Sequence, residues 1–466
     1  MTFVLPHGRL MIAAAVLGAC SPATTCKLEP PAEGDGRLSA DGTVLRDSLG
    51  RAVYLRGLNM GGRSKFAPFS PFDYQPGGFQ PALDAYLDRA AGWGIDVARV
   101  PFTWEAVEPT QGSDDAEFLS RYDALLAGLW ARGIRSIVDF HQDVYAQVYC
   151  GDGFPAWTLP PPYPAPHHDC PDWGRRYLED ADVIAAFDRF WDAGSPVQAE
   201  YGSLWDRVAA RYANTPGVIG FELFNEPGWG SAAIDPWEQT VLSPFIETMA
   251  ARVHAVAPNG LVFFEGAGAD GLLDITYLER PSGTGLVYAP HYYQLAPDAA
   301  KVRPDMKYFV DRATGWNVPV VFGEFGVGAN QADAGELMTA HWDALEALGV
   351  GGTEWEYSTS TELWNSEHNS VAEADGGENL TASALVRIYL RALAGSGLAV
   401  TRAAGSVSWS YIGASGVTEI AVPARAVPNG YDVEATGACV DSNHSGVLLV
   451  KAAGAGKPVS VTVRPR

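Results

Sequence analysis

Cysteine is scarce in this sequence, with five residues among 466, and none of them has the C-x-x-C spacing of a zinc site. No G-x-G-x-x-G motif follows the first strand-like run, which speaks against a dinucleotide-binding role. Beyond the N-terminus, no apolar run is long enough for a membrane-spanning helix. We therefore expect no metal ion, no cofactor and no transmembrane segment.

Basic residues are also few, since 32 lysines and arginines against 55 aspartates and glutamates give a net charge of −23. Such an acidic surface repels nucleic acid and gains no electrostatic attraction to anionic membranes. We expect neither a nucleic-acid partner nor a protein partner, and any lipid contact has to be apolar.

The chain is rich instead in hydrophobic residues, at 47%, which is enough for a large folded core.

The N-terminus has the features of an export signal. An apolar run over 10–19 follows a basic residue and is too short to span a bilayer, but it suits a secretory h-region. The letters LGAC at 17–20 are similar to a bacterial lipobox, whose cysteine carries lipid. The alternative is cleavage nearby, which leaves Cys20 or Cys26 free to pair. We predict a signal peptide over 1–20 and a secreted protein, or one that Cys20 anchors to the outer face of the bacterial cell membrane.

Two further cysteines bracket a long loop. Cys150 and Cys170 lie on either side of a stretch rich in proline and glycine. An exported protein can form disulfides, and a bridge here would hold the loop in one shape. We predict the disulfide Cys150–Cys170, and we expect His167 and His168 within the loop to be solvated rather than to bind metal.

Strand-like and helix-like runs alternate over most of the chain. Apolar runs bounded by turn residues occur at 53–59, 95–102, 134–140, 217–224, 261–266, 286–293, 318–326 and 350–357. Segments between them, such as 81–94 and 118–133, carry apolar residues at i, i+3 and i+4 and end at glycine. Eight such units predict parallel strands in a (β/α)8 TIM barrel, an α/β fold whose active site lies at the C-terminal ends of the strands. An open doubly wound sheet is the alternative.

The character of the chain changes near residue 391, where short alternating strands with glycine and proline turns begin. They predict a small β-sandwich over 391–466 that packs against the barrel. The predicted order is thus a signal over 1–20, a polar linker over 21–36, a (β/α)8 catalytic domain over 37–390 and the C-terminal sandwich.

Polar or aromatic side chains are predicted at the end of nearly every barrel strand, the place where TIM barrels carry catalytic groups. In chain order they are Asn59, Arg99, His141, Asp143, Asn225, Glu226, Glu265, His291, Tyr293, Glu324 and Trp355. Glu226 and Glu324 are the two acids that glycoside hydrolysis requires: one protonates the leaving oxygen and the other attacks or activates water. Glu222, Phe224 and Glu226 are expected to share one face of their strand, with Glu222 deeper in the barrel. We therefore predict that Glu222 is a buried structural acid.

The neighbours of the two acids suit these roles. Arg99 can favour the ionised form of Glu324, and Tyr293 can donate a hydrogen bond to it. Asn225 suits the sugar 2-hydroxyl, and Trp355 offers a flat face for a sugar ring. Two strand-end histidines are expected to serve the site without binding metal: His141 and His291.

Several motifs resemble glycoside hydrolase family five, a retaining (β/α)8 family. They are NEP at 225–227, HYY at 291–293, GEFG at 323–326, EW at 354–355 and ARVPFTWEAVEP at 98–109. LRGLNMGGRSKFAPF, and DFHQDVYAQ followed by GDGFPAW, are similar to the endoglycoceramidase branch, as is the C-terminal sandwich. The resemblance covers nearly all of the chain after the signal.

The resemblance implies that Glu226 is the acid/base and Glu324 the nucleophile, with carboxyl groups about 5–5.5 Å apart. It implies the following substrate-binding residues: Lys65, Arg99, His141, Asp143, Trp173, Asn225, His291, Tyr293 and Trp355. The substrate would be a glycosphingolipid at a membrane or micelle surface, cut between glycan and ceramide. One side of the cleft must then be apolar, and 64–72 and the loop 150–170 are candidates for that rim.

Two other functions stay open at this point. One is a family-five β-glucanase that acts on polysaccharide, which an open groove with aromatic rings on both sides of the acids would favour. The other is a non-catalytic carbohydrate-binding protein of the cell surface, against which the two intact glutamates argue.

Overall fold

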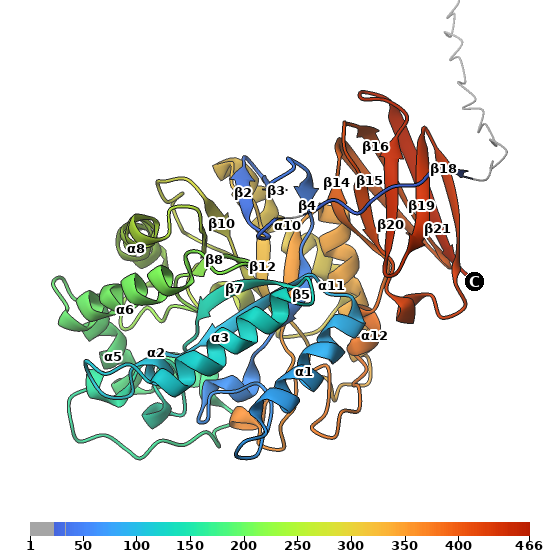
Figure 1. Ribbon diagram of the computed structural model, residues 1–466. Coiled ribbons are helices and arrows are strands. Elements are labelled where there is room, and N and C mark those ends of the chain that lie inside the picture. Colours follow the sequence, from blue (N-terminus) through green and yellow to red (C-terminus); the bar gives the residue numbers. More distant parts are fainter. Residues whose placement is uncertain (1–22, 33) are drawn as a thin grey trace, which may run out of the picture.

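The protein, described by a computed structural model over residues 23–32 and 34–466, consists of a barrel and a β-sandwich that lie side by side (Figure 1). The predicted signal, with Cys20, lies outside the described residues. Within the described residues, no helix combines the length and the apolar character that crossing a membrane requires.

Eight strand positions form the barrel. They are β5 (Arg56–Asn59), β6 (Val97–Phe102), β7 (Arg135–Phe140), β8 (Val218–Glu222), β9 (Leu261–Phe264), β10 (Leu286–Tyr288) with β11 (His291–Tyr292), β12 (Val321–Phe325) and β13 (Gly351–Glu354). All neighbours are parallel, and β13 pairs with β5. Pro290, which has no N–H to donate, separates β10 from β11. β10 pairs with β9 and β11 with β12, which closes the ring and confirms the predicted (β/α)8 barrel.

Helices surround the barrel (Figure 1). They are α1 (Phe79–Trp93), α2 (Trp104–Val107), α3 (Ala116–Trp130), α4 (Arg176–Glu179), α5 (Ala181–Trp191), α6 (Pro196–Tyr212), α7 (Ile234–Trp237), α8 (Ser243–Val256), α9 (Asp270–Leu273), α10 (Ala299–Trp316), α11 (Ala334–Leu348) and α12 (Ala382–Leu385). Helix α1 buries Leu83, Tyr86, Leu87, Ala90 and Trp93, which share one face. It ends at Gly94, whose φ of 82° suits a residue without a side chain.

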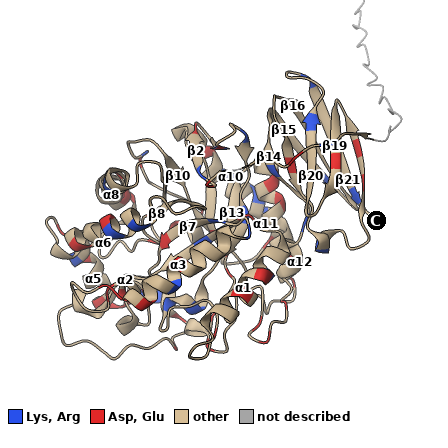
Figure 2. Ribbon diagram, in the orientation of Figure 1, with Lys and Arg blue, Asp and Glu red and all other residues tan. Residues whose placement is uncertain are grey.

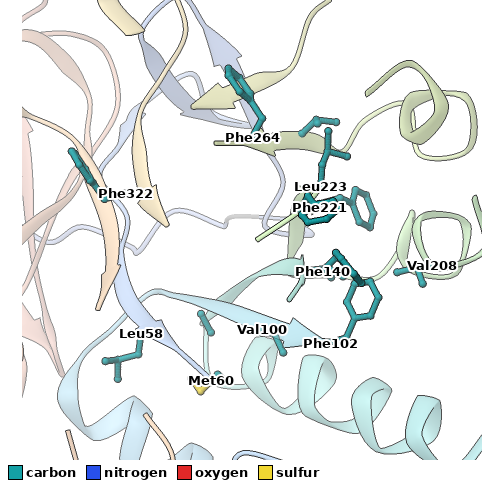
Figure 3. Packing of buried hydrophobic residues seen from close by; sticks show 14 of the residues in the cluster. Leu58, Met60, Val100, Phe102, Phe140, Val208, Phe221, Leu223, Phe264 and Phe322 are labelled. Atoms are coloured by element: carbon teal, nitrogen blue, oxygen red, sulfur yellow. The ribbon is translucent and has the colours of Figure 1, made fainter. Parts of the chain in front are cut away.

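The barrel core has an outer and an inner part. On the helix side, Phe102 and Phe140 from neighbouring strands pack with their rings 5.9 Å apart, among the residues drawn in Figure 3. Inside the barrel, an apolar cluster that includes Val97, Ile137 and Phe263 fills the end where the strands begin. Both faces of each strand are covered, so the strand residues are buried on both sides.

The sandwich consists of two sheets. The four-stranded sheet has the order β15 (Gly395–Ala403), β16 (Ser406–Gly413), β21 (Pro458–Pro465) and β18 (Tyr431–Thr436). The other has the order β1 (Thr24–Thr25), β19 (Ala438–His444), β20 (Val447–Ala452), β17 (Thr418–Ala421), β14 (Tyr389–Leu393), β4 (Ala52–Val53), β3 (Val44–Asp47) and β2 (Leu38–Asp41). Their facing sides form a separate core around Trp409, which is 0% exposed.

The N-terminal segments belong to the sandwich sheet, which differs from the predicted domain boundaries. β1 lies within the expected linker over 21–36 and pairs with β19, and Cys26 forms a disulfide with Cys439. The hairpin of β2 and β3, placed in the catalytic domain from the sequence, continues through β4 onto β14. An isolated strand signal does not reveal its partner, so the sequence indicated the hairpin of β2 and β3 but not its sheet, and β1 was not predicted.

Charged residues occur on the outer helices and loops and on strands of the sandwich, where acidic and basic residues are interspersed (Figure 2). The barrel interior departs from this pattern, because Arg99, Asp139 and Glu222 are all fully buried. Buried charges are retained where they are paired, and this layer lies directly beneath the C-terminal ends of the strands.

Candidate active site

The C-terminal mouth of the barrel forms a cleft of about 240 Å³. Its lining comes from seven of the eight strand positions: Lys65, His141, Asp143, Trp173, Asn225, Glu226, Gly268, Gly271, Leu272, Tyr293, Glu324, Trp355, Glu367 and Asn369. Nine residues predicted for the site are among them. Two more, Arg99 and His291, lie beneath the floor and are 0% and 3% exposed.

The two candidate catalytic carboxylates are close together on the cleft floor. An oxygen of Glu226 lies within 4.8 Å of an oxygen of Glu324. Between them, Nδ1 of His291 lies 2.9 Å from Glu226 Oε1 and 3.6 Å from Glu324 Oε2. Retaining glycosidases place these groups about 5–5.5 Å apart, whereas inverting enzymes leave about 6.5–9.5 Å for a water. The spacing therefore suits direct attack by one carboxylate.

Glu324 lies in β12 and accepts hydrogen bonds from two donors. Nη1 of Arg99 lies 2.7 Å from Glu324 Oε1, and the hydroxyl of Tyr293 lies 2.8 Å from Oε2. A positive charge and an O–H that converge on a carboxylate favour its charged form. This is the arrangement that a carboxylate nucleophile needs.

Glu226 stands on a turn just beyond β8 and has a positive φ of 45°. Its N–H donates to Glu265 Oε1 at 2.8 Å, and its carbonyl oxygen accepts from Gln142 Nε2 at 2.7 Å. Phe224 does not share its face, contrary to the expectation, because regular strand ends at Glu222. The Phe224 ring packs instead on the helix side against Phe140.

The environment of Glu226 favours its protonated form. Burial raises the pKa of Glu226 to about 8, and the negative charge of Asp143 adds to this effect, while Lys65 and His141 oppose it. A carboxyl group with this pKa still carries its proton at neutral pH. Glu226 is thus suited to protonate a leaving group, and Glu324 is suited to attack.

Arg99 is the centre of the buried polar layer. It donates to both oxygens of Glu222, at 2.9 and 3.0 Å, and lies 3.0 Å from Asp139. It also donates to the side-chain oxygens of Asn59 and Asn225 at 2.9 and 2.8 Å. The prediction that Glu222 is a buried, paired structural acid is confirmed.

One wall of the cleft is formed by a buried ion pair beneath aromatic rings. Nζ of Lys65 lies 2.6 Å from Asp143 and 4.5 Å from the ring centre of Trp355. His141 stacks on Trp355 with the rings 5.1 Å apart, and its Nδ1 contacts Asp139 at 2.9 Å. Burial opposes the charged imidazole, but Asp139 and Asp143 outweigh it and raise the pKa of His141 to about 10. This wall therefore offers fixed charges and one flat face.

The other predicted sugar contacts, Asn225 and Trp173, lie on different parts of the fold. The amide of Asn225 donates to the Gln142 carbonyl at 2.9 Å, while its oxygen accepts from Arg99, so both ends are oriented. Trp173 lies on the loop after β7 and packs against Trp364, with ring centres 4.9 Å apart. Trp173 thus borders the cleft from a loop, whereas Asn225 is fixed to the barrel.

Cys150 and Cys170 form a disulfide. Asn365 holds both of its ends, because its amide donates to the Cys150 carbonyl at 2.6 Å and its oxygen accepts from the Cys170 N–H at 2.9 Å. The neighbouring Trp364 lies under Lys65, 3.9 Å from Nζ. The disulfide loop is thereby attached to the wall of the cleft.

Sequence reasoning did not identify several residues of the site. Asp139 and Gln142 flank His141, so the alternation of β7 could have indicated that Asp139 shares its face. Glu367 lies 3.5 Å from Lys65 and comes, like Asn369, from a long loop after β13 that has no periodic pattern. No local signal in the sequence points to these two.

Three groups in the site have the donor types of a metal centre, and one of them is His141, Asp143 and Asp152, where Lys65 already pairs with Asp143. His291 belongs to the other two, with Glu226 and Glu324 in one and with Glu222 and Glu265 in the other. The guanidinium of Arg99 already supplies positive charge to Glu222 and Glu324. A cation bound to Glu226 would also compete with the proton that an acid catalyst needs. We therefore keep the prediction of a metal-independent site.

A (β/α)8 barrel that carries two carboxyl groups at this spacing, one with a raised pKa and one that accepts hydrogen bonds from Arg99 and Tyr293, has the fold and site of a retaining glycoside hydrolase. Residues 58–361 match the cellulase family, glycosyl hydrolase family 5. The chain belongs to this family, as its motifs indicated.

The similarity to known proteins extends beyond the residues that match the family. It is 28% identical over 460 residues to endoglycoceramidase I of Rhodococcus hoagii (strain 103S), which covers 91% of this chain and 88% of the relative. The solved structure of endo-glycoceramidase II from Rhodococcus sp. superposes with a TM-score of 0.75 at 26% identity, covering 90% and 99% of the two chains. An endogalactoceramidase structure shares the fold, with a TM-score of 0.71 at 21% identity and coverage of 92% and 100%.

Proposed function

We propose that the protein hydrolyses the bond between the glycan and the ceramide of glycosphingolipids, with Glu226 as acid/base and Glu324 as nucleophile. The observation that carries this proposal is an asymmetric cleft. Charged and aromatic groups line one wall, whereas Leu272 lines the other, and two further exposed leucines follow the same or the next barrel strand. A glycolipid has the same division into a polar and an apolar part.

The polar wall suits the sugar. Lys65, Asp143 and Glu367 offer charged donors and acceptors, and Trp355 offers a ring face. These groups follow β5, β7 and β13 along the barrel. Sugar hydroxyls require such fixed polar partners, because an unpaired hydroxyl in a closed site costs binding free energy.

The apolar rim lies across the barrel. Leu272, in the cleft wall, and Leu273 are 42% and 50% exposed, and Leu295 is 77% exposed. They follow β9 and β11. Because Lys65 follows the first barrel strand and Leu272 the fifth of eight, the two lie on opposite sides of the mouth. Exposed leucines beside a cleft are typical of a site for an apolar ligand or surface.

The rim differs from the two stretches expected from the sequence. Within 64–72, Phe66 and Phe72 are buried in loop packing. In the loop 150–170, Phe154 and Leu159 are also buried, and Tyr163 is 41% exposed. Loops that carry aromatic residues are recognisable in a sequence, but whether those residues face solvent depends on tertiary packing.

The proposed reaction has two steps. Glu324 attacks the anomeric carbon while Glu226 gives its proton to the ceramide oxygen, which breaks the glycosidic bond and leaves a glycosyl ester on Glu324. Glu226, now ionised, takes a proton from water, and the water oxygen displaces Glu324 from the anomeric carbon. Two inversions give net retention. Among the relatives, endo-glycoceramidase II from Rhodococcus sp. has been solved as a lactosyl-enzyme intermediate and in complex with ganglioside GM3, which supports the proposal.

The test is to incubate the protein with glucosylceramide, galactosylceramide and lactosylceramide and, in parallel, with a soluble β-glucan. We expect release of ceramide together with the intact sugar, whose initial anomer, observed by NMR, is β. Cleavage of the glucan alone would contradict the ceramide substrate and favour the polysaccharide alternative. Unchanged behaviour of the Glu226→Gln and Glu324→Gln variants would favour a carbohydrate-binding protein.

We further propose that the protein acts outside the cytoplasm, secreted or anchored through Cys20. The disulfides Cys26–Cys439 and Cys150–Cys170 support this location, because disulfides persist mainly in oxidising compartments. Mass spectrometry of the mature N-terminus is the test. A diacylglyceryl group on Cys20 would establish the anchor, cleavage without lipid would establish secretion, and an intact Met1 would contradict export.

A further inference from the structure

We infer that Glu265 is a positioning residue for the acid/base: it fixes the tautomer of His291, so that the imidazole accepts a hydrogen bond from the protonated carboxyl group of Glu226. The inference rests on the proposed role of Glu226 as proton donor. It assigns a function to an acid that does not line the cleft and that neither the proposed reaction nor the sugar contacts require.

Glu265 lies directly after β9, behind the acid/base, and is 5% exposed. Its Oε1 accepts the backbone N–H of Glu226 at 2.8 Å. The same oxygen lies 3.4 Å from Nε2 of His291. On the opposite side of the ring, Nδ1 of His291 lies 2.9 Å from Glu226 Oε1. The three side chains thus form a row from Glu265 through His291 to Glu226.

The surroundings of Nε2 determine which ring nitrogen carries the proton. Within the described residues this buried nitrogen has no hydrogen-bond partner of good geometry. Two carboxyl oxygens lie near it, of Glu265 at 3.4 Å and of Glu222 at 4.0 Å. An N–H directed toward carboxyl oxygens is attracted to them, whereas a lone pair directed toward them is repelled. The proton of a neutral His291 therefore belongs on Nε2.

A proton on Nε2 leaves a lone pair on Nδ1, which can accept the O–H of protonated Glu226. The other tautomer would donate from Nδ1 to Glu226 and stabilise the carboxylate, which cannot protonate a leaving group. His291 keeps its Nε2–H through the reaction. The transferred proton moves from Glu226 to the leaving oxygen, and a proton from water later returns to Glu226.

The charges around this row are compatible with a neutral imidazole. Burial lowers the pKa of His291 to about 4, against the attraction of Glu324 and with the support of Arg99. Burial, together with Glu222 and Glu226, raises the pKa of Glu265 well above its usual range. Its Oε1 accepts the N–H of Glu226 and is the oxygen that faces Nε2. Other charged groups that face the row from neighbouring strands are Asp139 and His141.

The test compares Glu265→Gln with Glu265→Leu in the full-length protein. A glutamine keeps a neutral carbonyl acceptor, whereas leucine removes it at similar size. The first measurement is the 15N NMR spectrum of protein labelled at histidine, in which His291 is assigned with a His291→Gln variant. We expect the Nε2–H tautomer in the wild type and in Glu265→Gln, and a shift toward Nδ1–H in Glu265→Leu.

The second measurement compares β-lactosides with good and poor leaving groups. A dinitrophenolate leaves without a proton, so Glu265→Leu should change its release less than about threefold. An alkyl lactoside needs the acid, and its kcat/KM should fall about 10²-fold or more, with the alkaline limb of its pH profile at lower pH. Glu265→Gln should resemble the wild type in both assays. Melting temperatures identify any variant that fails to fold.

An Nδ1–H tautomer in the wild type would overturn the inference. So would equal losses of Glu265→Leu on both lactosides with an unchanged tautomer, because this pattern indicates a structural role only. The NMR measurement needs no substrate, and the lactosides contain no ceramide. Failure of the proposed lipid substrate would therefore be distinguishable from failure of this inference.

Discussion

A carboxylate oxygen of Glu226 lies within 4.8 Å of one of Glu324, yet the charged groups next to the two side chains differ. Glu324 accepts hydrogen bonds from Arg99 and Tyr293, whereas burial and the nearby Asp143 keep a proton on Glu226. Two identical side chains thus have different hydrogen-bond partners and different neighbouring charges. This difference is what a two-step displacement requires of its acid and its nucleophile.

Replacing either carboxylate should impair a different step. Glu324→Gln removes the nucleophile and should lower kcat/KM on every glycoside by at least about 10³-fold. Glu226→Gln should lower it by about 10²–10⁴-fold on lipid or alkyl glycosides, while a dinitrophenyl glycoside still forms the glycosyl-enzyme in a rapid burst. The control is Glu117→Gln on the exposed face of α3, which should behave as wild type. Equal burst amplitudes in the two site variants would contradict the assigned roles.

Activity should fall in alkaline solution because of Glu226. Because its pKa is raised to about 8, the carboxyl group of Glu226 is protonated below that pH and loses its proton as the pH rises further. The plot of kcat/KM for lactosylceramide against pH should therefore have an alkaline limb near pH 8. A substrate with a dinitrophenolate leaving group should lack this limb in its first step. A limb near pH 4–5, typical of exposed glutamates, would contradict the prediction.

The leucine rim should matter for lipid substrates alone. Replacing Leu272, Leu273 and Leu295 together by serine removes apolar surface without touching the carboxylates. We expect kcat/KM on lactosylceramide in micelles to fall by about tenfold or more, from roughly 25 cal/mol per Å² of lost apolar contact. Hydrolysis of a soluble aryl lactoside should not change. Leu49→Ser is the control, since Leu49 is 52% exposed on the turn between β3 and β4.

Glu354 should make stability depend on pH, although it lies outside the cleft. It is 1% exposed, and one of its oxygens accepts from Trp342 Nε1 at 3.0 Å. Burial raises its pKa from 4.5 to about 8. Between these two values the folded state binds more protons than the unfolded state, so the free energy of unfolding decreases as the pH rises, by up to about 1.4 kcal/mol per pH unit.

The variant Glu354→Gln isolates this effect, since its carbonyl can still accept from Trp342. Denaturant unfolding at pH 5 and pH 8 should show a smaller loss of stability in the variant than in the wild type. At pH 8 the variant should be the more stable of the two. Identical pH dependence in both proteins would show that Glu354 does not ionise in this range.

The barrel and its two carboxylates were predictable because their signals are local. Apolar runs bounded by turn residues mark the strands, periodic apolar faces mark the helices between them, and Glu226 and Glu324 stand where strands end. Contacts between distant segments were not predictable in this way. Nothing near Glu367 or Trp364 in the sequence indicates that their loop returns to Lys65, and the exposure of Leu295 depends on which loop covers it.

The strand pairing also constrains the order in which the protein can form. β4 borders β14, and β1 borders β19, so segments made at the start of synthesis have neighbours made at its end. The last barrel strand ends at Glu354, more than eighty residues before β19 of the sandwich begins at Ala438. A nascent chain can thus close its barrel while its leading strands still expose unpaired edges. Translation must reach the last strands before these edges are covered.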